Sequence, residues 1–574
     1  MRTYSYPDRS PLLDRLWLLQ DRHGYLPEAA RQSLAQEMGL SVTALDGVVS
    51  FYHFFHLEPA GKHQIYLDNS ILAEQRGLGA IRQALQAATG APIGGVDPSG
   101  TFGLYETSCI GLSDQEPAML VDFQPFTHLT PERVHEVMAA LKNGIPAVKL
   151  ADHPRSHLRH TPSPSRTVFF RPYRPGSILA RMRHMSPEEV LSEMEASGLP
   201  GLGGAFFPVG RKWRLCREQP APRRYLIANA DEGEPGTYKD RVLMQRLPGL
   251  LLEGMILGGY AAGAQEGILY LRAEYRYLQA GLQRLIDDFY RQGWLGHQAA
   301  GIAGFDFDIR IQLGAGAYVC GGETALIESL EGKRGEPRSR RYYPVVRGYH
   351  NAPTVVNNVE SLVAAARIIE LGADWFRSIG TPDTPGTKLM SVAGDCARPG
   401  IYEVPWGTSV QELLNLCEAA DTQMVQVSGP AGTSLGPKAW GRIFSVKDVR
   451  AGGSVMIFDH RRDLLQILLN YAAFFRLESC GLCTPCRAGT YLIQRKLHHL
   501  ARGQGSDRDL ADLTTWGDIM QAGSRCGLGQ TAANSVRDML EQFPDYFASR
   551  LAPQTSYPGF DLTTARRAYD ELIR

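Results

Sequence analysis

One glycine-rich run decides the fold of this chain: Gly201-Leu202-Gly203-Gly204-Ala205-Phe206-Phe207-Pro208-Val209-Gly210-Arg211-Lys212-Trp213. Its four glycines leave the backbone without Cβ atoms, so a phosphate or a flat ring can approach it closely. Lys212 adds the positive charge that a phosphate requires. Taken alone, such a loop could equally be an ordinary surface turn that binds nothing.

A second run supports a ligand site. The acidic turn Asn229-Ala230-Asp231-Glu232-Gly233-Glu234 follows an apolar, strand-like segment, Tyr225-Leu226-Ile227-Ala228. In open α/β sheets, ligands bind at the carboxyl ends of the strands. The glycine-rich loop, its lysine and the acidic turn therefore predict together a cradle for a nucleotide or a flavin.

Composition narrows the class of protein. The length of 574 residues suggests roughly four domains. Acidic and basic residues balance at 60 each, so no overall field draws the chain to nucleic acid or to an anionic membrane. The N-terminus lacks the apolar segment of a secretory signal, and the apolar stretch 247–264 is interrupted by Glu253, which favours a core helix over a membrane span. We expect a cytoplasmic protein without membrane insertion.

The glycine-rich run resembles the FMN-binding loop of the NADH-oxidising flavoprotein subunits of respiratory complex I. Related subunits of NAD-reducing hydrogenases and NAD-dependent formate dehydrogenases share this loop. It typically reads GRGGAGFPTG-x-KW, and here Leu202 replaces the Arg and Phe206 replaces a Gly. Three later runs match the same family in the same order, at residues 314–324, 341–344 and 353–360. Where the family usually has two acidic residues, this chain has Gly322-Glu323.

The resemblance implies the site residues. FMN would carry the hydride transfer itself, so no side chain is expected to be catalytic. The residues expected to hold FMN are Gly201, Gly203, Gly204, Lys212, Asn229, Asp231, Glu232, Tyr318, Gly321, Gly322, Glu323, Asn357 and Asn358. The NAD(H) site would be lined by Phe207, Glu234 and Tyr343. A hydride would pass between the nicotinamide and the flavin, and the protein would supply positioning and electrostatics.

A cysteine motif predicts a metal centre. Three of the nine cysteines, Cys480, Cys483 and Cys486, lie on one short loop, and Cys526 can complete the set. Thiolates so closely spaced suit the corners of a [4Fe–4S] cube, whereas structural zinc more often uses two separated Cys-x2-Cys pairs. We expect the cluster, with zinc as the alternative, in a reducing compartment.

The N-terminal part resembles the thioredoxin-like subunit of complex I, which is normally a separate chain with a [2Fe–2S] cluster. Alignment on the resembled subunit puts Asp68, Ala73, Cys109 and Ser113 at its four ligand positions. Only one thiolate remains, so we expect a thioredoxin-like domain without this cluster.

The expected fold class is a multidomain α/β protein. Its predicted parts are an N-terminal helical segment (1–62), the thioredoxin-like domain (63–150), a Pro-rich linker (151–175), a Rossmann-like FMN- and NAD-binding domain (176–385), a β-grasp, SLBB-like domain (386–460) and a helical [4Fe–4S] domain (461–574).

The predicted activity is that of a diaphorase, in which NAD(H) exchanges a hydride with FMN and single electrons pass through a [4Fe–4S] cluster. Fusion of the thioredoxin-like and flavin parts resembles the large diaphorase subunits of soluble NAD-reducing nickel–iron hydrogenases. The partners would then be a smaller iron–sulfur diaphorase subunit and a hydrogenase module. The alternatives are an NADH-binding subunit of complex I or of a formate dehydrogenase, and, from another class, a non-catalytic scaffold with structural zinc.

Overall fold

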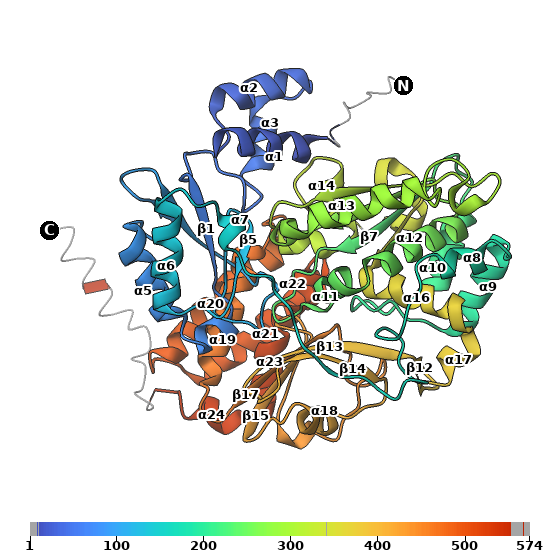
Figure 1. The fold of residues 1–574 in the computed structure, drawn as a ribbon. Coiled ribbons are helices and arrows are strands. Elements are labelled where there is room, and N and C mark those ends of the chain that lie inside the picture. Colours follow the sequence, from blue (N-terminus) through green and yellow to red (C-terminus); the bar gives the residue numbers. More distant parts are fainter. Residues whose placement is uncertain (1–8, 10, 340, 553–565, 568–574) are drawn as a thin grey trace.

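The computed structural model describes residues 9, 11–339, 341–552 and 566–567, so the predicted first and last domains both extend outside the described residues. Three helices form the N-terminal part, at the top of Figure 1: α1 (Leu12–His23), α2 (Glu28–Glu37) and α3 (Val42–Val49). Helix α1 ends at Gly24, whose φ of 78° suits glycine, and the Ser41 hydroxyl caps α3 by accepting from the Ala44 amide.

A thioredoxin-like domain follows, with a five-stranded sheet in the order β2-β3-β1-β4-β5. Strand β1 pairs parallel with β3 and antiparallel with β4. The strands are β1 (His63–Asp68), β2 (Gly95–Val96), β3 (Phe102–Thr107), β4 (Met119–Val121) and β5 (Gln124–Phe126), and the helices are α4 (Ile71–Gln75), α5 (Leu78–Thr89), α6 (Pro131–Lys142) and α7 (Ala147–Leu150). This domain has an apolar cluster of its own, to which α5 and α6 contribute.

The segment predicted as a linker is bound to the rest of the molecule. Its strand β6 (Leu158–His160) pairs parallel with β14 (Gly400–Pro405). The buried Glu403 carboxylate accepts hydrogen bonds from the amides of Val168 (2.5 Å) and Phe169 (3.1 Å). These contacts use backbone groups of the segment, and their partners lie more than 200 residues away, so no local sequence pattern predicts them.

The central domain contains an all-parallel, four-stranded sheet in the order β10-β7-β8-β9. Its strands are β7 (Tyr225–Ala230), β8 (Glu266–Leu271), β9 (Asp308–Leu313) and β10 (Thr354–Asn358). Its helices are α8 (Ser177–Met182), α9 (Pro187–Ser197), α10 (Val209–Arg217), α11 (Lys239–Arg246), α12 (Pro248–Ala262), α13 (Arg276–Arg291), α14 (Glu323–Leu330), α15 (Pro344–Arg347), α16 (Val359–Leu371) and α17 (Ala373–Arg377). The apolar stretch 247–264 forms the buried helix α12, as predicted. No helix in the described part of the chain is long and apolar enough to cross a membrane.

A second, six-stranded sheet has the order β16-β15-β17-β13-β14-β6. Its remaining strands are β13 (Thr387–Gly394), β15 (Thr422–Val427), β16 (Thr433–Leu435) and β17 (Ser454–Asp459); the short pair β11 (Gly380–Thr381) and β12 (Thr384–Pro385) precedes it, and α18 (Val410–Leu416) is its helix. Figure 1 shows this sheet below the central domain, so that β13 lies under the central helices.

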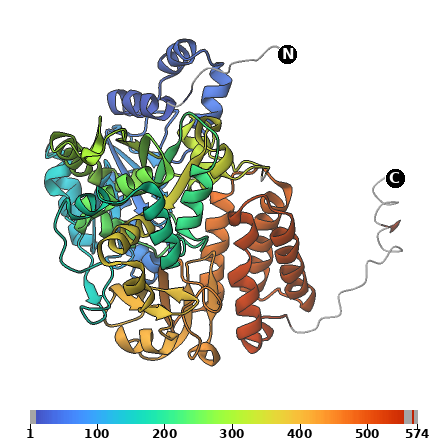
Figure 2. The same ribbon diagram turned by 90° about the vertical axis from the view of Figure 1, so that its right-hand side faces the viewer.

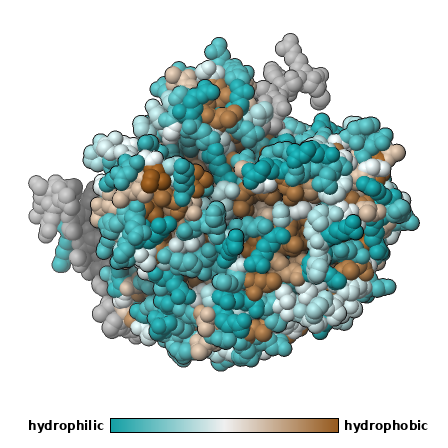
Figure 3. Space-filling model, viewed as in Figure 1, coloured by the Kyte–Doolittle hydropathy of each residue, from teal (hydrophilic) through white to brown (hydrophobic). Residues whose placement is uncertain are grey.

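Helices make up the described C-terminal part, which Figure 2 shows as a bundle beside the rest of the molecule. They are α19 (Leu464–Glu478), α20 (Thr484–Ala501), α21 (Asp507–Gly523), α22 (Gly527–Thr531), α23 (Asn534–Gln542) and α24 (Pro544–Ala548). A Cβ at Gly489 would lie 2.3 Å from Met520 Sδ, so glycine allows α20 and α21 to approach closely. One apolar core joins this bundle, the central domain, the second sheet and the N-terminal helices. The face drawn in Figure 3 is largely hydrophilic, with apolar patches over its middle.

Candidate functional site

The glycine-rich run forms a closed loop between α9 and the first turn of α10. The Gly201 amide donates to the Phe207 carbonyl (3.0 Å), and the Phe206 amide donates to the Gly201 carbonyl (3.2 Å). Gly204 has a φ of 101°, and Phe206, which replaces a glycine of the resembled loop, still adopts a φ of 59°. A Cβ at Gly203 would lie 2.9 Å from Asn358 Cβ. The loop is therefore a bare backbone cradle at a helix N-terminus, where an anion is favoured.

Lys212 extends from α10 towards the edge of the parallel sheet. Its ammonium group pairs with the Glu323 carboxylate and donates to the Val356 carbonyl (3.0 Å). The next residue, Trp213, donates its indole N–H to Asn357 Oδ1 (2.8 Å). The loop, the end of β10 and the start of α14 thus meet at one place.

The acidic turn after β7 reaches the same place. Asn229 donates its side-chain amide to the Gly321 carbonyl (2.9 Å), and its Oδ1 accepts from the Asp231 amide (3.1 Å). Burial raises the pKa of the Asp231 carboxyl well above its usual value. Because β7 and β10 are neighbours, their carboxyl ends bring Asn229 and Asn357 to one edge of the sheet, as expected for a ligand site.

Glu234 lies behind this edge, next to the second sheet. The Tyr318 hydroxyl and the Ala431 amide (3.0 Å to Oε1) both donate to its carboxylate. Burial raises the pKa of the Glu234 carboxyl to about 7, and both hydrogen bonds oppose that rise. The Tyr318 ring also packs edge-on against Phe474 of α19, with the ring centres 4.9 Å apart.

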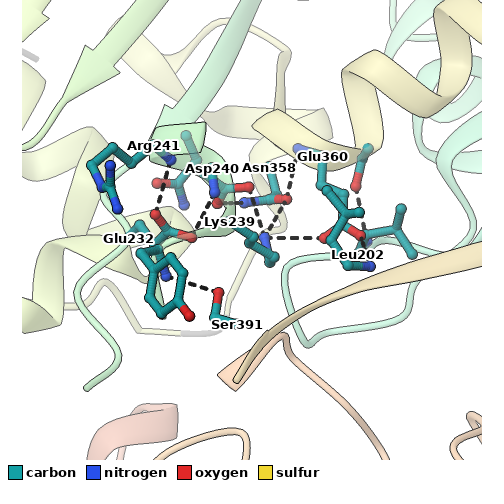
Figure 4. Close-up of polar contacts among 12 residues, drawn as sticks. Leu202, Glu232, Lys239, Asp240, Arg241, Asn358, Glu360 and Ser391 are labelled. Atoms are coloured by element: carbon teal, nitrogen blue, oxygen red, sulfur yellow. Dashed lines mark hydrogen bonds and ion pairs between the residues drawn. The ribbon is translucent and has the colours of Figure 1, made fainter. Parts of the chain in front are cut away.

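Two predicted FMN residues have partners inside the protein, as Figure 4 shows. The Glu232 carboxylate accepts from the amides of Asp240 (2.8 Å) and Arg241 (3.1 Å) at the start of α11. Asn358 caps α16, and its amide donates to Asp240 Oδ2 (2.6 Å). Any contact of these two side chains with FMN stays a prediction.

The three predicted NAD(H) residues are more scattered. Phe207 is 44% exposed and Tyr343 is 74% exposed, whereas Glu234 is largely enclosed. Among the described residues, no hydrogen bond joins any two of these three side chains. Tyr343 follows the loop that lines a cleft of about 640 Å³, together with Arg338, Arg341 and Tyr342.

The four predicted cluster ligands lie in one neighbourhood. Cys483 and Cys526 are the N-cap residues of α20 and α22, and Cys486 lies in the first turn of α20. Burial and the charges of the other three thiols raise the pKa of Cys486 to about 12. No three His, Cys, Asp or Glu side chains among the described residues converge as one shared metal ion would require. In a [4Fe–4S] cube each thiolate binds its own iron, so its ligands need not converge on one ion. That these four cysteines hold the cluster stays a prediction.

One connecting residue was missed from the sequence. Glu478 at the end of α19 is buried and accepts hydrogen bonds from the Tyr318 amide (2.9 Å) and the Ser108 hydroxyl (3.0 Å). It therefore links the turn before α14, the thioredoxin-like domain and the cysteine loop. A glutamate at a helix end gives no sequence signal for such a role, because its partners are more than 150 residues away.

Comparisons with known proteins agree with this arrangement. The chain matches three described families: "Nuo51 FMN-binding domain" at residues 194–367, "Thioredoxin-like [2Fe-2S] ferredoxin" at 1–142 and "NADH-ubiquinone oxidoreductase-F iron-sulfur binding region" at 466–550. It is 45% identical to the NAD-reducing hydrogenase HoxS subunit alpha of Cupriavidus necator, over 99% of this chain and 96% of that protein. The chain belongs to this family of NAD-reducing hydrogenase alpha subunits.

Two further similar proteins differ in how much of this chain they match. A crystal structure of NAD+-reducing [NiFe]-hydrogenase in the H2-reduced state matches with a TM-score of 0.90 and 37% identity, over 99% of this chain and 97% of that one. An NADH-quinone oxidoreductase subunit of Aquifex aeolicus is 38% identical, over 66% of this chain and 90% of that protein. These two NAD-reducing hydrogenase proteins therefore match 99% of the chain, whereas the quinone oxidoreductase subunit matches about two thirds of it.

As a family member, the chain contains an FMN-binding domain and a [4Fe–4S] region. The family matched by the N-terminal part is described as a [2Fe–2S] ferredoxin. That its ligand positions are occupied here by Asp68, Ala73, Cys109 and Ser113 stays a prediction. Asp68 accepts from the amides of Ser70 (2.8 Å) and Ile110 (3.0 Å), and Cys109 Sγ lies 3.2 Å from Ser113 Oγ. Burial, followed by the charge of Asp68, raises the pKa of the Cys109 thiol to about 11, which disfavours a thiolate there.

Proposed function

We propose that this chain is the NAD(H)-reacting flavin subunit of a soluble NAD-reducing hydrogenase. The observation that carries the proposal is the whole-length similarity to the HoxS alpha subunit. The intact loop-and-lysine site and the four grouped cysteines support it. Complex I and formate dehydrogenase subunits remain alternatives of the same class. The zinc scaffold is disfavoured because the chain matches an FMN-binding domain and an iron–sulfur region of NADH oxidoreductases.

In the proposed function, FMN supplies the change from two-electron to one-electron transfer, and the cluster carries single electrons. The glycine loop presents backbone amides at the start of α10, and Lys212 offsets phosphate charge. Asn229 and Asn357 fix the sheet edge against which a flat ring can lie. Glu234 presents a carboxylate to which ribose hydroxyls can donate. Phe207 and Tyr343 offer exposed rings for an adenine or nicotinamide.

Finer parts of the proposal rest on resemblance. We infer a Rossmann-like FMN domain, a β-grasp domain over 386–460 and FMN contacts from all the residues predicted for them. The partners would be a smaller iron–sulfur diaphorase subunit and a hydrogenase module, and the location would be cytoplasmic. Leu482 in the cysteine loop, and Leu477 and Tyr491 on either side of it in the sequence, are exposed and offer a partner apolar contacts near the point at which electrons would leave.

The test is the diaphorase reaction of the purified chain, alone or with its iron–sulfur partner. NADH should reduce ferricyanide or a viologen without hydrogen, and the FMN absorbance should bleach on mixing. The variant Lys212→Met should lose most of its FMN, while the exposed Lys447→Met variant should keep it. An FMN-replete preparation that fails to oxidise NADH would refute the proposal.

A further inference from the structure

Leu202, near the start of the glycine cradle, is held through both of its backbone polar groups by residues outside the loop. The Leu202 carbonyl accepts a hydrogen bond from Lys388 Nζ (2.9 Å), and the Leu202 amide donates to Ser361 Oγ (2.8 Å). Lys388 comes from β13 of the second sheet, and Ser361 comes from the first turn of α16. We call Lys388 and Ser361 the Leu202 clamp.

The clamp fixes the direction of the Gly203 amide, the first free amide of the loop. A trans peptide is planar, so the Leu202 carbonyl and the Gly203 N–H point in opposite directions. With the carbonyl turned to Lys388, the Gly203 N–H is turned away from the second sheet. Within the described chain, the amides of Gly203, Gly204 and Ala205 have no hydrogen-bond partner. Successive backbone N–H groups left free in a turn can together bind an anionic oxygen.

Lys388 is fixed by a buried ionic network, part of which appears in Figure 4. Its ammonium group pairs with Glu360, whose other oxygen accepts from the Leu389 amide (2.9 Å). Lys239 lies 3.1 Å from Glu360 and 2.7 Å from Asp240. The side chains of Lys388 and Glu360 have no exposed surface. A buried, hydrogen-bonded pair of this kind is costly to form and is poorly explained by stability alone.

We infer that Lys388 is a positioning residue for the flavin cradle: with Ser361 it orients the Leu202–Gly203 peptide so that the loop amides are ready to bind FMN. The inference rests on the proposed function, and it makes the second sheet a working part of the flavin site. Burial lowers the pKa of Lys388 to about 8, while Glu360 opposes this and keeps the group charged at neutral pH.

The experiment uses the full chain after reversible removal of FMN. The Kd for FMN is measured by quenching of flavin fluorescence, and the visible circular dichroism of the saturated protein reports the surroundings of the flavin. Lys388→Met should weaken FMN binding at least tenfold and change the dichroism, because the freed peptide no longer has one orientation. Ser361→Ala, which releases the other end of the same residue, should weaken binding several-fold. Lys447→Met, an exposed lysine of the same domain, should change neither value.

The outcomes separate the inference from the function on which it rests. If both clamp variants bind FMN as tightly as Lys447→Met and show the same dichroism, the positioning role is wrong and the flavin function stands. If the unaltered chain itself fails to bind FMN, the proposed function and the inference both fall. If Lys388→Met does not fold, the Ser361→Ala variant decides the question. An FMN affinity and a dichroism spectrum of Ser361→Ala equal to those of the wild type would then overturn the inference.

Discussion

Glu234 shows how burial tunes a single residue of the site. Its pKa is raised to about 7 by burial, so the carboxyl loses its charge as pH falls below 7. A carboxylate near the ribose would repel the extra phosphate of NADP(H), and a neutral carboxyl would not. We therefore expect the preference for NADH over NADPH, as a ratio of kcat/KM values, to rise by about tenfold between pH 6 and pH 8.

The variant Glu234→Gln keeps the shape of the side chain but cannot ionise. Its preference for NADH should be lower than that of the wild type at pH 8, and it should not change with pH. The exposed Glu136→Gln is the matched control, since it removes a carboxylate far from the flavin domain. A wild-type preference that is flat from pH 6 to pH 8 would count against a role for Glu234 in nucleotide selection.

At the scale of elements, α12 and α16 form the support of the cradle. A Cβ at Gly254 of α12 would lie 2.3 Å from the Leu362 carbonyl oxygen of α16. Because this oxygen belongs to the backbone, the two helices would have to move apart to relieve the clash. The start of α16 carries Asn358 and Ser361. Gly254→Ala should thus destabilise the domain by about 1–3 kcal/mol and also weaken FMN binding.

Gly281→Ala on α13 is the control, because its added Cβ would contact only the end of the Arg284 side chain, at 4.0 Å. This variant should be neutral or slightly stabilising. Thermal unfolding and FMN titration of both variants test the two expectations.

The elements also show what sequence could and could not predict. The cysteine loop, the glycine run and the apolar stretch of α12 are local patterns that the sequence itself displays. The helix α12 is confirmed, whereas the roles of the first two rest partly on a family resemblance and stay predictions. Lys388 and Glu478 gave no such signal, because each acts on a backbone group more than 150 residues away. The strand β6 was missed for the same reason: it is short, and its pairing partner β14 lies far along the chain. Contacts between domains depend on tertiary packing, which no local window contains.

At the scale of the whole molecule, the thioredoxin-like domain is docked through the turn that contains Cys109, a residue predicted to lie at a [2Fe–2S] ligand position of the resembled subunit. Arg272 of the central domain donates to the Cys109 carbonyl (2.8 Å), and Arg241 donates to the Gly111 carbonyl (2.9 Å). A Cβ at Gly111 would lie 2.1 Å from the Tyr275 hydroxyl, so the two surfaces are in close contact. The turn thus attaches the thioredoxin-like domain to the central domain.

The thioredoxin-like domain should contain no iron–sulfur cluster. A [2Fe–2S] centre needs four protein ligands, and Ala73 offers no donor at all, while the raised pKa of Cys109 disfavours its thiolate. The purified chain should therefore contain about four iron atoms, all in the cube ligated by the four C-terminal cysteines. Cys109→Ser should keep that iron content, and Cys486→Ser should lose most of it. About six iron atoms per chain, or a [2Fe–2S] signal in electron paramagnetic resonance that vanishes in Cys109→Ser, would mean that other residues complete a cluster in this domain.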